Sequence, residues 1–416
     1  MSWHDSRGRW MRYARATEGM NTPLAILDLD AFDANRRDLL RRANGTPIRV
    51  ASKSIRSRRA LASILTHDGF SGVMAFSLAE AIWLATEHRS WEPLPDILVG
   101  YPSVDAAAIA QLAADPELSD RITVMTDDIA HLDLLDEAVR TTGNQIRVCI
   151  DVDSSWRPRG PRSRPLTHVG ARRSPLHEVD EVLTFTREVL VRKGLRLVGL
   201  MFYEAQIAGV GDRPAGRKVR GQFIHLMQSA SSSDLAERRP LIVNAVAREL
   251  ADRGRAELEF VNSGGTGSIE LSAADPTVTE VTAGSGFYGP TLFDDYRHFS
   301  VQPAAAFGVP VVRRPGPGWV TVLGGGYVAS GAADSSRLPT PWLPEGLSLD
   351  SQEGAGEVQT PLKGHAADGL GIGDLVWFRP AKAGEMCEHF NELLLIRGDE
   401  VTQAIPTYRG EGKVFV

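Results

Sequence analysis

The sequence has little cysteine. Its 416 residues include two, Cys149 and Cys387, and they lie far apart. Two distant cysteines exclude the disulfide framework of a small secreted protein, and such scarcity is typical of a reducing compartment. Long apolar runs are also missing: the N-terminus, MSWHDSRGRWMRYARA, lacks the apolar core of a secretory signal, and no run has the length that spans a membrane. We therefore expect a cytoplasmic protein.

The chain also lacks an excess of positive charge, because its formal net charge is -6. A negative balance argues against general attraction to nucleic acid or to an anionic membrane. Arginines do cluster locally, at Arg157, Arg159, Arg162, Arg164, Arg172 and Arg173. This cluster is either a solvated basic loop or a loop that helps to hold an anionic substrate or cofactor.

Short apolar runs alternate with helical patterns over most of the chain. Nine runs are predicted strands, at 24–29, 48–52, 70–75, 95–99, 122–126, 146–152, 196–200, 257–262 and 278–282, and predicted helices between them include 30–42, 57–66, 78–88, 128–140, 176–193 and 236–252. Nearly continuous apolar strands indicate a parallel sheet that is covered on both faces. This many strand–helix units favour a closed (β/α)8 barrel of the TIM type. A barrel has eight places, so either the first or the last strand lies outside it.

The pattern of apolar and turn-forming residues changes near residue 300. Short apolar runs punctuated by Gly and Pro follow, in VPVVRRPGPGWVTVLGGGYVASG, GLGIGDLVWFRP and HFNELLLIRG. They predict a β-domain of hairpins, with a long loop at 330–368. A chain of 416 residues suits two domains. We expect a barrel with an N-terminal lead-in at 1–298 and a smaller β-rich domain at 299–416.

Lys53 ends the apolar run in RVASKSIRS. Its amine is expected at the carboxyl end of an early barrel strand, where barrel enzymes keep their chemistry. An amine held against apolar strand residues is more readily neutral and available for imine formation. A lysine flanked by Ser52 and Ser54 also suits an ordinary surface position, so this candidate needs a second element.

Two glycine-rich turns provide that element. The first, VNSGGTGS at 261–268, follows a late predicted strand. Its glycines let backbone N–H groups approach an anion, and the hydroxyls of Thr266 and Ser268 add donors, so the turn suits a phosphate. It has neither the lysine of a P-loop nor the spacing of a dinucleotide fingerprint, and a flexible turn is the alternative. The second turn, AGSGFYGP at 283–290, follows one strand later and is placed to close over the same phosphate.

Taken in order, the motifs resemble those of a known family. They are TPLAILDLDAFDAN, RVASKSIRS, DVDSSWRPRG with HVGARRSP, GLMFYEAQ, SGGTGS and AGSGFYGP. This set resembles the fold-type III pyridoxal phosphate enzymes, the alanine racemase-like barrels, and is most similar to their D-threonine aldolase and D-serine dehydratase branch. The resemblance extends from Thr22 to about Phe415. It implies a barrel that binds pyridoxal 5'-phosphate, followed by a smaller β-domain.

The resemblance also implies roles for single residues. Lys53 would be the catalytic lysine that carries the cofactor as a Schiff base. Tyr203, in GLMFYEAQ, matches a tyrosine beside the cofactor ring, with a core aromatic as the alternative. An arginine after the DVD strand binds the phenolic oxygen of the cofactor in this family, and the longer spacing here leaves Arg157 and Arg159 as rivals. The residues implied to hold the phosphate are Gly264, Gly265, Thr266, Gly267, Ser268, Ser285, Gly286 and Tyr288.

The C-terminal region departs from the family. Metal-dependent members carry a His-x-Cys pair there, whereas this chain reads AGEMCEHFNE and places Glu385 where the histidine would be. A carboxylate beside Cys387 is a poorer zinc site than histidine, because it mixes a hard oxygen with a soft thiolate. His389 substitutes only if the loop shifts. A divalent metal is therefore possible but not favoured.

The sequence leaves the reaction open. The branch favours an aldolase that cleaves a β-hydroxy-D-amino acid; a racemase and a D-serine dehydratase-like deaminase are the alternatives. A non-catalytic pyridoxal phosphate carrier is a rival of another class, although carriers tend to be bare barrels. A third possibility, which sets the resemblance aside, is a barrel enzyme for a phosphorylated metabolite with Lys53 as acid or base.

The implied partners are a small amino-acid substrate and a second copy of the chain. The family builds its active site from the barrel of one subunit and the β-domain of another, which implies a homodimer. Tyr327 and Tyr408 are the first candidates for acids that cross the subunit boundary, and each is also compatible with a packed aromatic.

Overall fold

The computed structural model describes residues 5–86, 95–158, 167–214 and 218–416. The chain divides into two compact units. The barrel unit comprises Leu39–Lys53, Ala62–Gly284 and Phe415–Val416, and the sheet unit comprises Met1–Asp38, Ser54–Leu61 and Ser285–Val414.

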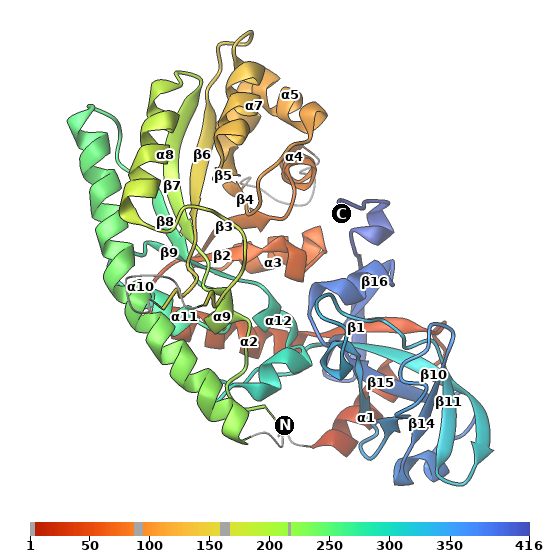
Figure 1. Ribbon diagram of the computed structural model, residues 1–416. Coiled ribbons are helices and arrows are strands. Elements are labelled where there is room, and N and C mark those ends of the chain that lie inside the picture. Colours follow the sequence, from red (N-terminus) through yellow and green to blue (C-terminus); the bar gives the residue numbers. More distant parts are fainter. Residues whose placement is uncertain (1–4, 87–94, 159–166, 215–217) are drawn as a thin grey trace. The chain divides into compact units, whose positions relative to one another are not determined.

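Eight parallel strands close into a barrel (Figure 1). They are β2 (Ile48–Ala51), β3 (Phe70–Ala75), β4 (Ile97–Val99), β5 (Ile122–Thr126), β6 (Ile146–Val152), β7 (Leu195–Phe202), β8 (Phe260–Ser263) and β9 (Glu280–Ala283). The barrel closes where β9 pairs with β2, with Val281 opposite Ile48. The predicted barrel is confirmed, and it takes the last eight of the nine predicted strands.

Helices precede the barrel strands or lie between them. They are α2 (Leu29–Ala43), α3 (Arg58–Leu65), α4 (Leu78–Thr86), α5 (Ala106–Ala114), α6 (Pro116–Arg121), α7 (Ile129–Val139), α8 (Val179–Val191), α9 (Ala205–Ala208), α10 (Lys218–Asp252) and α11 (Ile269–Ala273). Several of them begin at acidic caps. The carboxylates of Asp105 and Asp128 accept backbone N–H bonds in the first turns of α5 and α7. Glu178 and Glu181 form a capping box on α8.

Helix α10 begins well before its predicted start at residue 236. Pro240 lies inside it, and several serines precede this proline in the helix. Both residue types favour helix ends when a sequence is read locally. Packing of α10 beside α8 outweighs that local preference. The short helices α5 and α6 were also missed by the sequence analysis.

A buried ion network holds the barrel strands together. Arg49 on β2 donates from Nε to Glu280 on β9 at 2.7 Å, and its Nη2 lies 3.2 Å from a carboxylate oxygen of Asp96. Burial opposes the charge on this guanidinium, but the two carboxylates outweigh it and raise the pKa of Arg49. Removing one partner of such a buried pair costs about 3–5 kcal/mol. The network therefore stabilises the barrel strands whose carboxyl ends lead into the candidate site.

The sheet unit contains the one predicted strand that is not in the barrel. Strand β1 (Leu24–Asp28) pairs antiparallel with β10 (Ala305–Gly316) and parallel with β16 (Glu392–Arg397), so the first predicted strand is the one outside the barrel. The other strands are β11 (Trp319–Leu323), β12 (Thr340–Leu343), β13 (Ser348–Leu349), β14 (Gln359–Lys363), β15 (Leu375–Arg379) and β17 (Glu400–Pro406). Hairpins β10–β11 and β16–β17 confirm the predicted β-domain. The unit also contains helices α1 (Ser6–Ala16) and α12 (Ser285–Tyr288).

The predicted long loop at 330–368 is wrong in part, because strands β12, β13 and β14 lie within it. Strand β14 pairs with β11, and Thr360 and Leu362 are buried. Its sequence, QTPLK, is short and contains proline, and its partner lies far away in sequence. The amino-acid composition of a segment does not predict pairing with a strand so distant in sequence. The predicted domain boundary at 298/299 stays a prediction.

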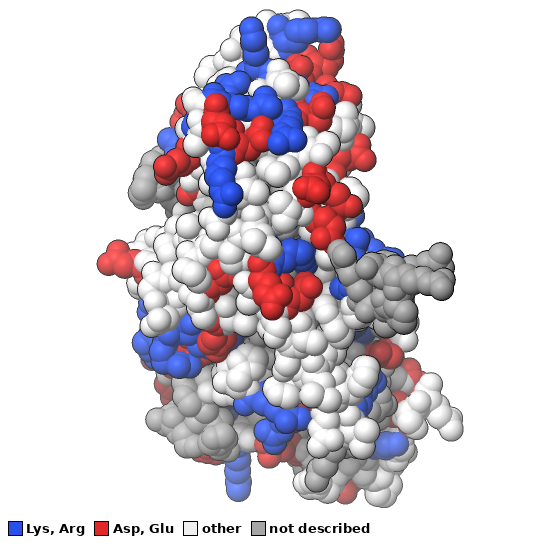
Figure 2. Space-filling model, turned by 60° about the vertical axis from the view of Figure 1, so that its left-hand side comes forward, with Lys and Arg blue, Asp and Glu red and all other residues white. Residues whose placement is uncertain are grey.

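The surface carries charges of both signs. On the face shown in Figure 2, basic and acidic side chains are interspersed, with wide areas that carry neither. No helix among the described residues is both long enough and apolar enough to cross a membrane.

Candidate active site

Lys53 lies directly after the first barrel strand. It occupies a short 3-10 turn, Ser52–Ser54, at the carboxyl end of β2. The hydroxyl of buried Ser52 donates to the carbonyl of Met74 at 3.0 Å and fixes this turn against β3. The Lys53 side chain is exposed, and its Nζ donates to the Tyr101 hydroxyl at 3.1 Å. The sequence predicts Lys53 at this end of the barrel; its bond to a cofactor stays a prediction.

Three more side chains gather around Lys53 from three other loops. Tyr101 follows β4, Tyr203 follows β7, and Arg173 lies between β6 and α8. The guanidinium carbon of Arg173 lies 5.3 Å from the ring centroid of Tyr101 and 5.1 Å from that of Tyr203. This stacking suits a cation held between two aromatic faces. We call Lys53, Tyr101, Arg173 and Tyr203 the mouth cluster.

The two tyrosines of the mouth cluster differ electrostatically. Burial by itself raises the pKa of Tyr101, but the charges of Lys53 and Arg173 outweigh burial, and the pKa lies below its ordinary value. Burial dominates at Tyr203 and raises its pKa. Tyr101 is therefore the more acidic phenol of the pair.

A buried carboxyl group completes the electrostatic environment. Asp151 lies near the end of β6, and burial raises its pKa to about 7, assisted by the negative charge of Asp127. The positive charge of Arg173 acts in the opposite direction. Asp127 follows β5, and burial raises its pKa as well. A carboxyl group that titrates near neutrality thus interacts electrostatically with the mouth cluster.

The SGGTGS turn follows β8 and has the backbone of a tight cradle. Gly264 has a φ of 88°, which favours glycine, and a Cβ there would lie 3.0 Å from the Ser272 hydroxyl. A Cβ on Gly265 would lie 2.9 Å from the Ala208 side chain and 3.4 Å from the ring of Tyr203. The turn therefore reaches Tyr203 only because these positions are glycine.

Glu204 organises this turn, a role that the sequence analysis missed. Its buried carboxylate accepts hydrogen bonds from the Ser263 hydroxyl at 3.1 Å, the Gly264 amide at 3.3 Å and the Ser272 hydroxyl at 2.5 Å. From the other side, Arg42 donates to the Thr266 carbonyl at 2.6 Å. The available signal was a charged residue at the end of an apolar strand, directly after Tyr203.

The arginine rivals have different surroundings. Arg157 pairs with Asp153 and donates from Nε to the Ser155 hydroxyl at 3.3 Å. Arg159, Arg162 and Arg164 lie outside the described residues. Arg173, which the sequence analysis named only as part of a basic cluster, is the arginine in the mouth cluster. Its motif, HVGARRSP, was visible in the sequence, but a fixed count from the DVD strand does not lead to it.

The second glycine-rich turn belongs to the sheet unit. Ser285, Gly286 and Tyr288 lie in α12, which follows β9 along the chain. The Tyr288 hydroxyl donates to the Ile55 carbonyl at 2.7 Å, and burial raises its pKa well above the ordinary value. This hydroxyl is therefore already hydrogen-bonded within the sheet unit. The predicted contribution of the segment to phosphate binding stays a prediction.

The candidate metal ligands have separate partners. Glu385 accepts the Ser330 amide at 2.9 Å, and His389 stacks on Tyr327 with ring centroids 4.1 Å apart. Buried Cys387 donates to the Ile55 carbonyl at 3.6 Å, and burial raises its pKa to about 12. Within the described ranges, no group of three or more His, Cys, Asp or Glu side chains could hold a metal ion. The AGEMCEHF segment therefore does not fit a metal site in this arrangement.

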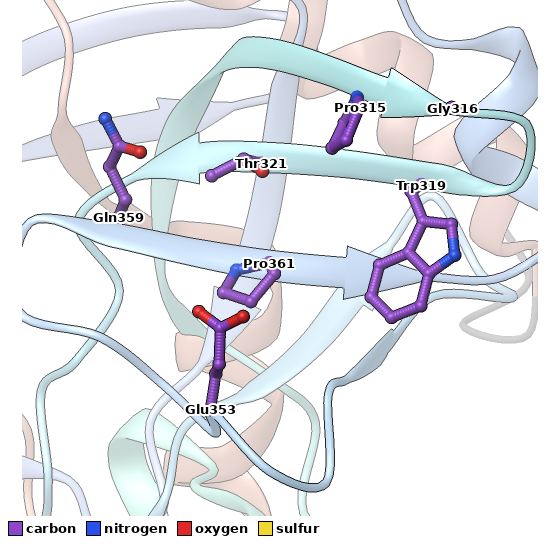
Figure 3. A pocket seen from close by; sticks show the side chains of 7 residues that line it. All are labelled: Pro315, Gly316, Trp319, Thr321, Glu353, Gln359 and Pro361. Atoms are coloured by element: carbon purple, nitrogen blue, oxygen red, sulfur yellow. The ribbon is translucent and has the colours of Figure 1, made fainter.

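Two surface pockets lie elsewhere and suit a phosphate poorly. One, of about 360 Å³, lies on the sheet unit between β10, β11 and β14 (Figure 3), and its lining includes Trp319, Glu353 and Pro361 but no lysine. The other, of about 490 Å³, is lined by Asp127, Asp128, Asp180, Glu181 and Glu188 among others. The several carboxylates of the second pocket repel a phosphate, whereas the mouth cluster contains the basic side chains Lys53 and Arg173.

A barrel with a lysine after its first strand and a glycine-rich turn after its seventh defines the alanine racemase-like class of barrels. Sequence comparison agrees: the family described as "Alanine racemase, N-terminal domain" matches residues 27–291, more than half of the chain. The chain belongs to this family. Enzymes of the family use pyridoxal phosphate, so the match confirms the predicted fold and cofactor and supports an enzyme.

Individual relatives point to one branch. A D-threonine aldolase from Arthrobacter sp. is 24% identical over 282 residues, which span 66% of this chain and 64% of that relative's length. The solved D-threonine aldolase from Filomicrobium marinum has a TM-score of 0.72 at 21% identity and covers 95% of this chain and 96% of its own. D-threo-3-hydroxyaspartate dehydratase from Delftia sp. HT23 has a TM-score of 0.69 at 19% identity, covering 94% and 98%. At these identities the solved structures show a shared fold.

The residues at the barrel mouth fit pyridoxal phosphate. Lys53 supplies a primary amine, Tyr203 an aromatic ring, and the SGGTGS turn a cradle that a Cβ would fill. The amides of Gly264 and Gly265 donate to Glu204 and Ser268, so the protein's own hydrogen bonds set the shape of the turn.

Proposed function

We propose that this chain is a pyridoxal phosphate-dependent lyase that cleaves a β-hydroxy-D-amino acid between Cα and Cβ, releasing an aldehyde. The proposal rests on the mouth cluster. Lys53 donates to the hydroxyl of Tyr101, and Arg173 stacks on the Tyr101 ring. The match to a D-threonine aldolase over 282 residues supports the choice of reaction.

Each residue of the site has a defined task in this proposal. When bound, pyridoxal phosphate supplies an electron sink for the bond that breaks at Cα. Lys53 would hold it covalently, and Thr266, Gly267 and Ser268 would hold its phosphate. Tyr203 would lie beside its ring. Arg173, rather than Arg157, is the arginine proposed to face its phenolic oxygen, because Arg173 is the one stacked on Tyr203.

The competing reactions differ in product, so product analysis is the decisive experiment. Purified protein is incubated with D- and L-β-hydroxy amino acids, each with and without chelator. An aldolase releases an aldehyde, a deaminating dehydratase a keto acid, and a racemase the inverted amino acid. An aldehyde from D substrates alone is the expected result. A protein that binds the cofactor and forms none of these products would be a carrier instead.

We also propose that the active form is a homodimer. Tyr327 is half-buried, and burial raises its pKa, while Tyr408 is 1% exposed in its own unit. Of the two, Tyr327 is thus the better candidate for an acid presented to a second subunit. Light scattering of the active protein tests the assembly, and an active monomer would contradict it.

A further inference from the structure

The hydroxyl group of Tyr101 has no part in the cofactor binding proposed above, yet it faces the central amine. Its oxygen lies 3.1 Å from Lys53 Nζ, and Arg173 stacks on its ring at 5.3 Å. Tyr101 follows β4 directly after Gly100, so the strand end fixes its backbone. A phenol held at this distance from the amine also lies close to a substrate whose amino group takes the place of that amine.

We propose that Tyr101 is a catalytic residue of this lyase and that its phenolic oxygen accepts the proton of the substrate β-hydroxyl. The proposal rests on the proposed function and deepens it. Cleavage of Cα–Cβ requires a base at that hydroxyl, and the base must lie within hydrogen-bond reach of it. The Tyr101 oxygen lies 3.1 Å from Lys53 Nζ, and the β-hydroxyl oxygen is three bonds from the substrate nitrogen, so a substrate whose nitrogen takes the place of this amine brings its β-hydroxyl near Tyr101.

The step balances without a further reactant. The β-hydroxyl proton passes to the Tyr101 oxygen, the Cα–Cβ bond breaks, and the C–O bond on Cβ becomes the carbonyl of the aldehyde. The electron pair of the broken bond stays with Cα until the proton returns there from Tyr101, which yields glycine. Tyr101 ends in its starting state, and nothing is oxidised or reduced.

The charges around Tyr101 favour this role. Lys53 approaches from the turn after β2 and Arg173 from the loop before α8; both stabilise the phenolate, while burial opposes it. Tyr203 after β7 and Asp151 on β6 both interact with Arg173. Because the pKa of Tyr203 is shifted upward, the two tyrosines are not interchangeable as bases.

The first test follows the ionisation of the phenol in the protein as purified, without substrate. Tyr101→Phe keeps the ring against Arg173 and removes the hydroxyl. Subtracting its alkaline ultraviolet titration from that of the wild type should leave one tyrosinate step below the ordinary value of 10. Arg173→Gln should move that step upward, and the control Tyr296→Phe, in the aromatic cluster with Phe293 and Phe299, should leave it in place. A step at or above 10 overturns the proposal.

The second test measures turnover. Tyr101→Phe should lower kcat for aldehyde release by roughly 10²–10⁴-fold, the range for loss of a general base. KM and bound cofactor should change little, because the ring is retained. If this variant keeps the wild-type kcat, the role of Tyr101 is wrong and the proposed function stands. If the wild type releases no aldehyde from any β-hydroxy-D-amino acid, the proposed function fails, and this role fails with it.

Discussion

Two regions of the molecule carry residues that the sequence singles out for chemistry, and only one brings them together. In the barrel unit, Lys53 and Tyr203 come from strands far apart in sequence and lie in one cluster. In the sheet unit, Glu385, Cys387 and His389 are close in sequence, yet each has its own partner.

The difference follows from how each region is built. The carboxyl ends of the parallel strands all lie at one end of the barrel. Residues that follow different strands therefore come together there, whatever their spacing in sequence. The AGEMCEHF segment is a short 3-10 turn, Gly384–Glu388, in which successive side chains point in different directions. Side chains that meet in space, rather than candidate residues that are close in sequence, therefore identify the site. The following predictions test that distinction.

The largest effect is expected at Lys53. Lys53→Ala removes the amine from the mouth cluster and should lower turnover on the order of 10⁴-fold or more, because the covalent attachment of the cofactor is lost. Borohydride reduction of the wild type, followed by peptide mapping, should place the pyridoxyl mass on the Lys53 peptide. A label on Lys193 or another lysine would contradict the assignment.

The next largest effect concerns Asp151. Its folded-state pKa of about 7 lies above the ordinary value of 3.8, so the folded protein keeps a proton that the unfolded chain loses. Its contribution to stability is therefore full below pH 3.8 and is lost as the pH rises through about 7, a decrease of about 4 kcal/mol. Asp151→Asn should flatten the dependence of the free energy of unfolding on pH, measured by urea denaturation across this range. The exposed control Asp252→Asn should retain the wild-type slope, and an equal slope in both variants would refute the prediction.

A smaller effect is expected at the glycine-rich turn. Thr266→Val should remove one hydrogen bond to the phosphate, which costs about 1.5–3 kcal/mol, or roughly tenfold to a hundredfold in cofactor affinity. Titration with pyridoxal phosphate, followed by its absorbance, measures this change, and circular dichroism reports the fold. Thr141→Val, at an exposed position, is the matched control. Unchanged affinity in Thr266→Val would move the phosphate elsewhere.

The sequence predicted the eight barrel strands, strand β1 and the position of Lys53, because apolar strand runs and their spacing are local signals. It named Arg173 only within a basic cluster and did not single out Glu204, because their roles depend on which loops meet at the mouth. It also missed strands β12 to β14, since their pairing is long-range and their composition resembles a loop. Local pattern predicts the barrel strands, while the contacts between their loops depend on the closure of the barrel.

The smallest effect on turnover is expected from metal removal. Because Glu385, Cys387 and His389 do not converge, activity should survive exhaustive chelation. Cys387→Ala should lower the free energy of unfolding by about 1 kcal/mol, the usual size for a buried substitution, and change kcat less than about twofold.

Cys149→Ala, which alters the buried cysteine of the barrel unit, is the matched control for this last prediction: it too should affect stability without changing the response to chelator. The thiol of Cys387 is buried and donates to the Ile55 carbonyl in this arrangement. If chelation abolishes turnover and added manganese or zinc restores it, the segment rearranges to bind metal. Glu385 and Cys387 would then be the leading ligands, and the contrast between the two regions would disappear.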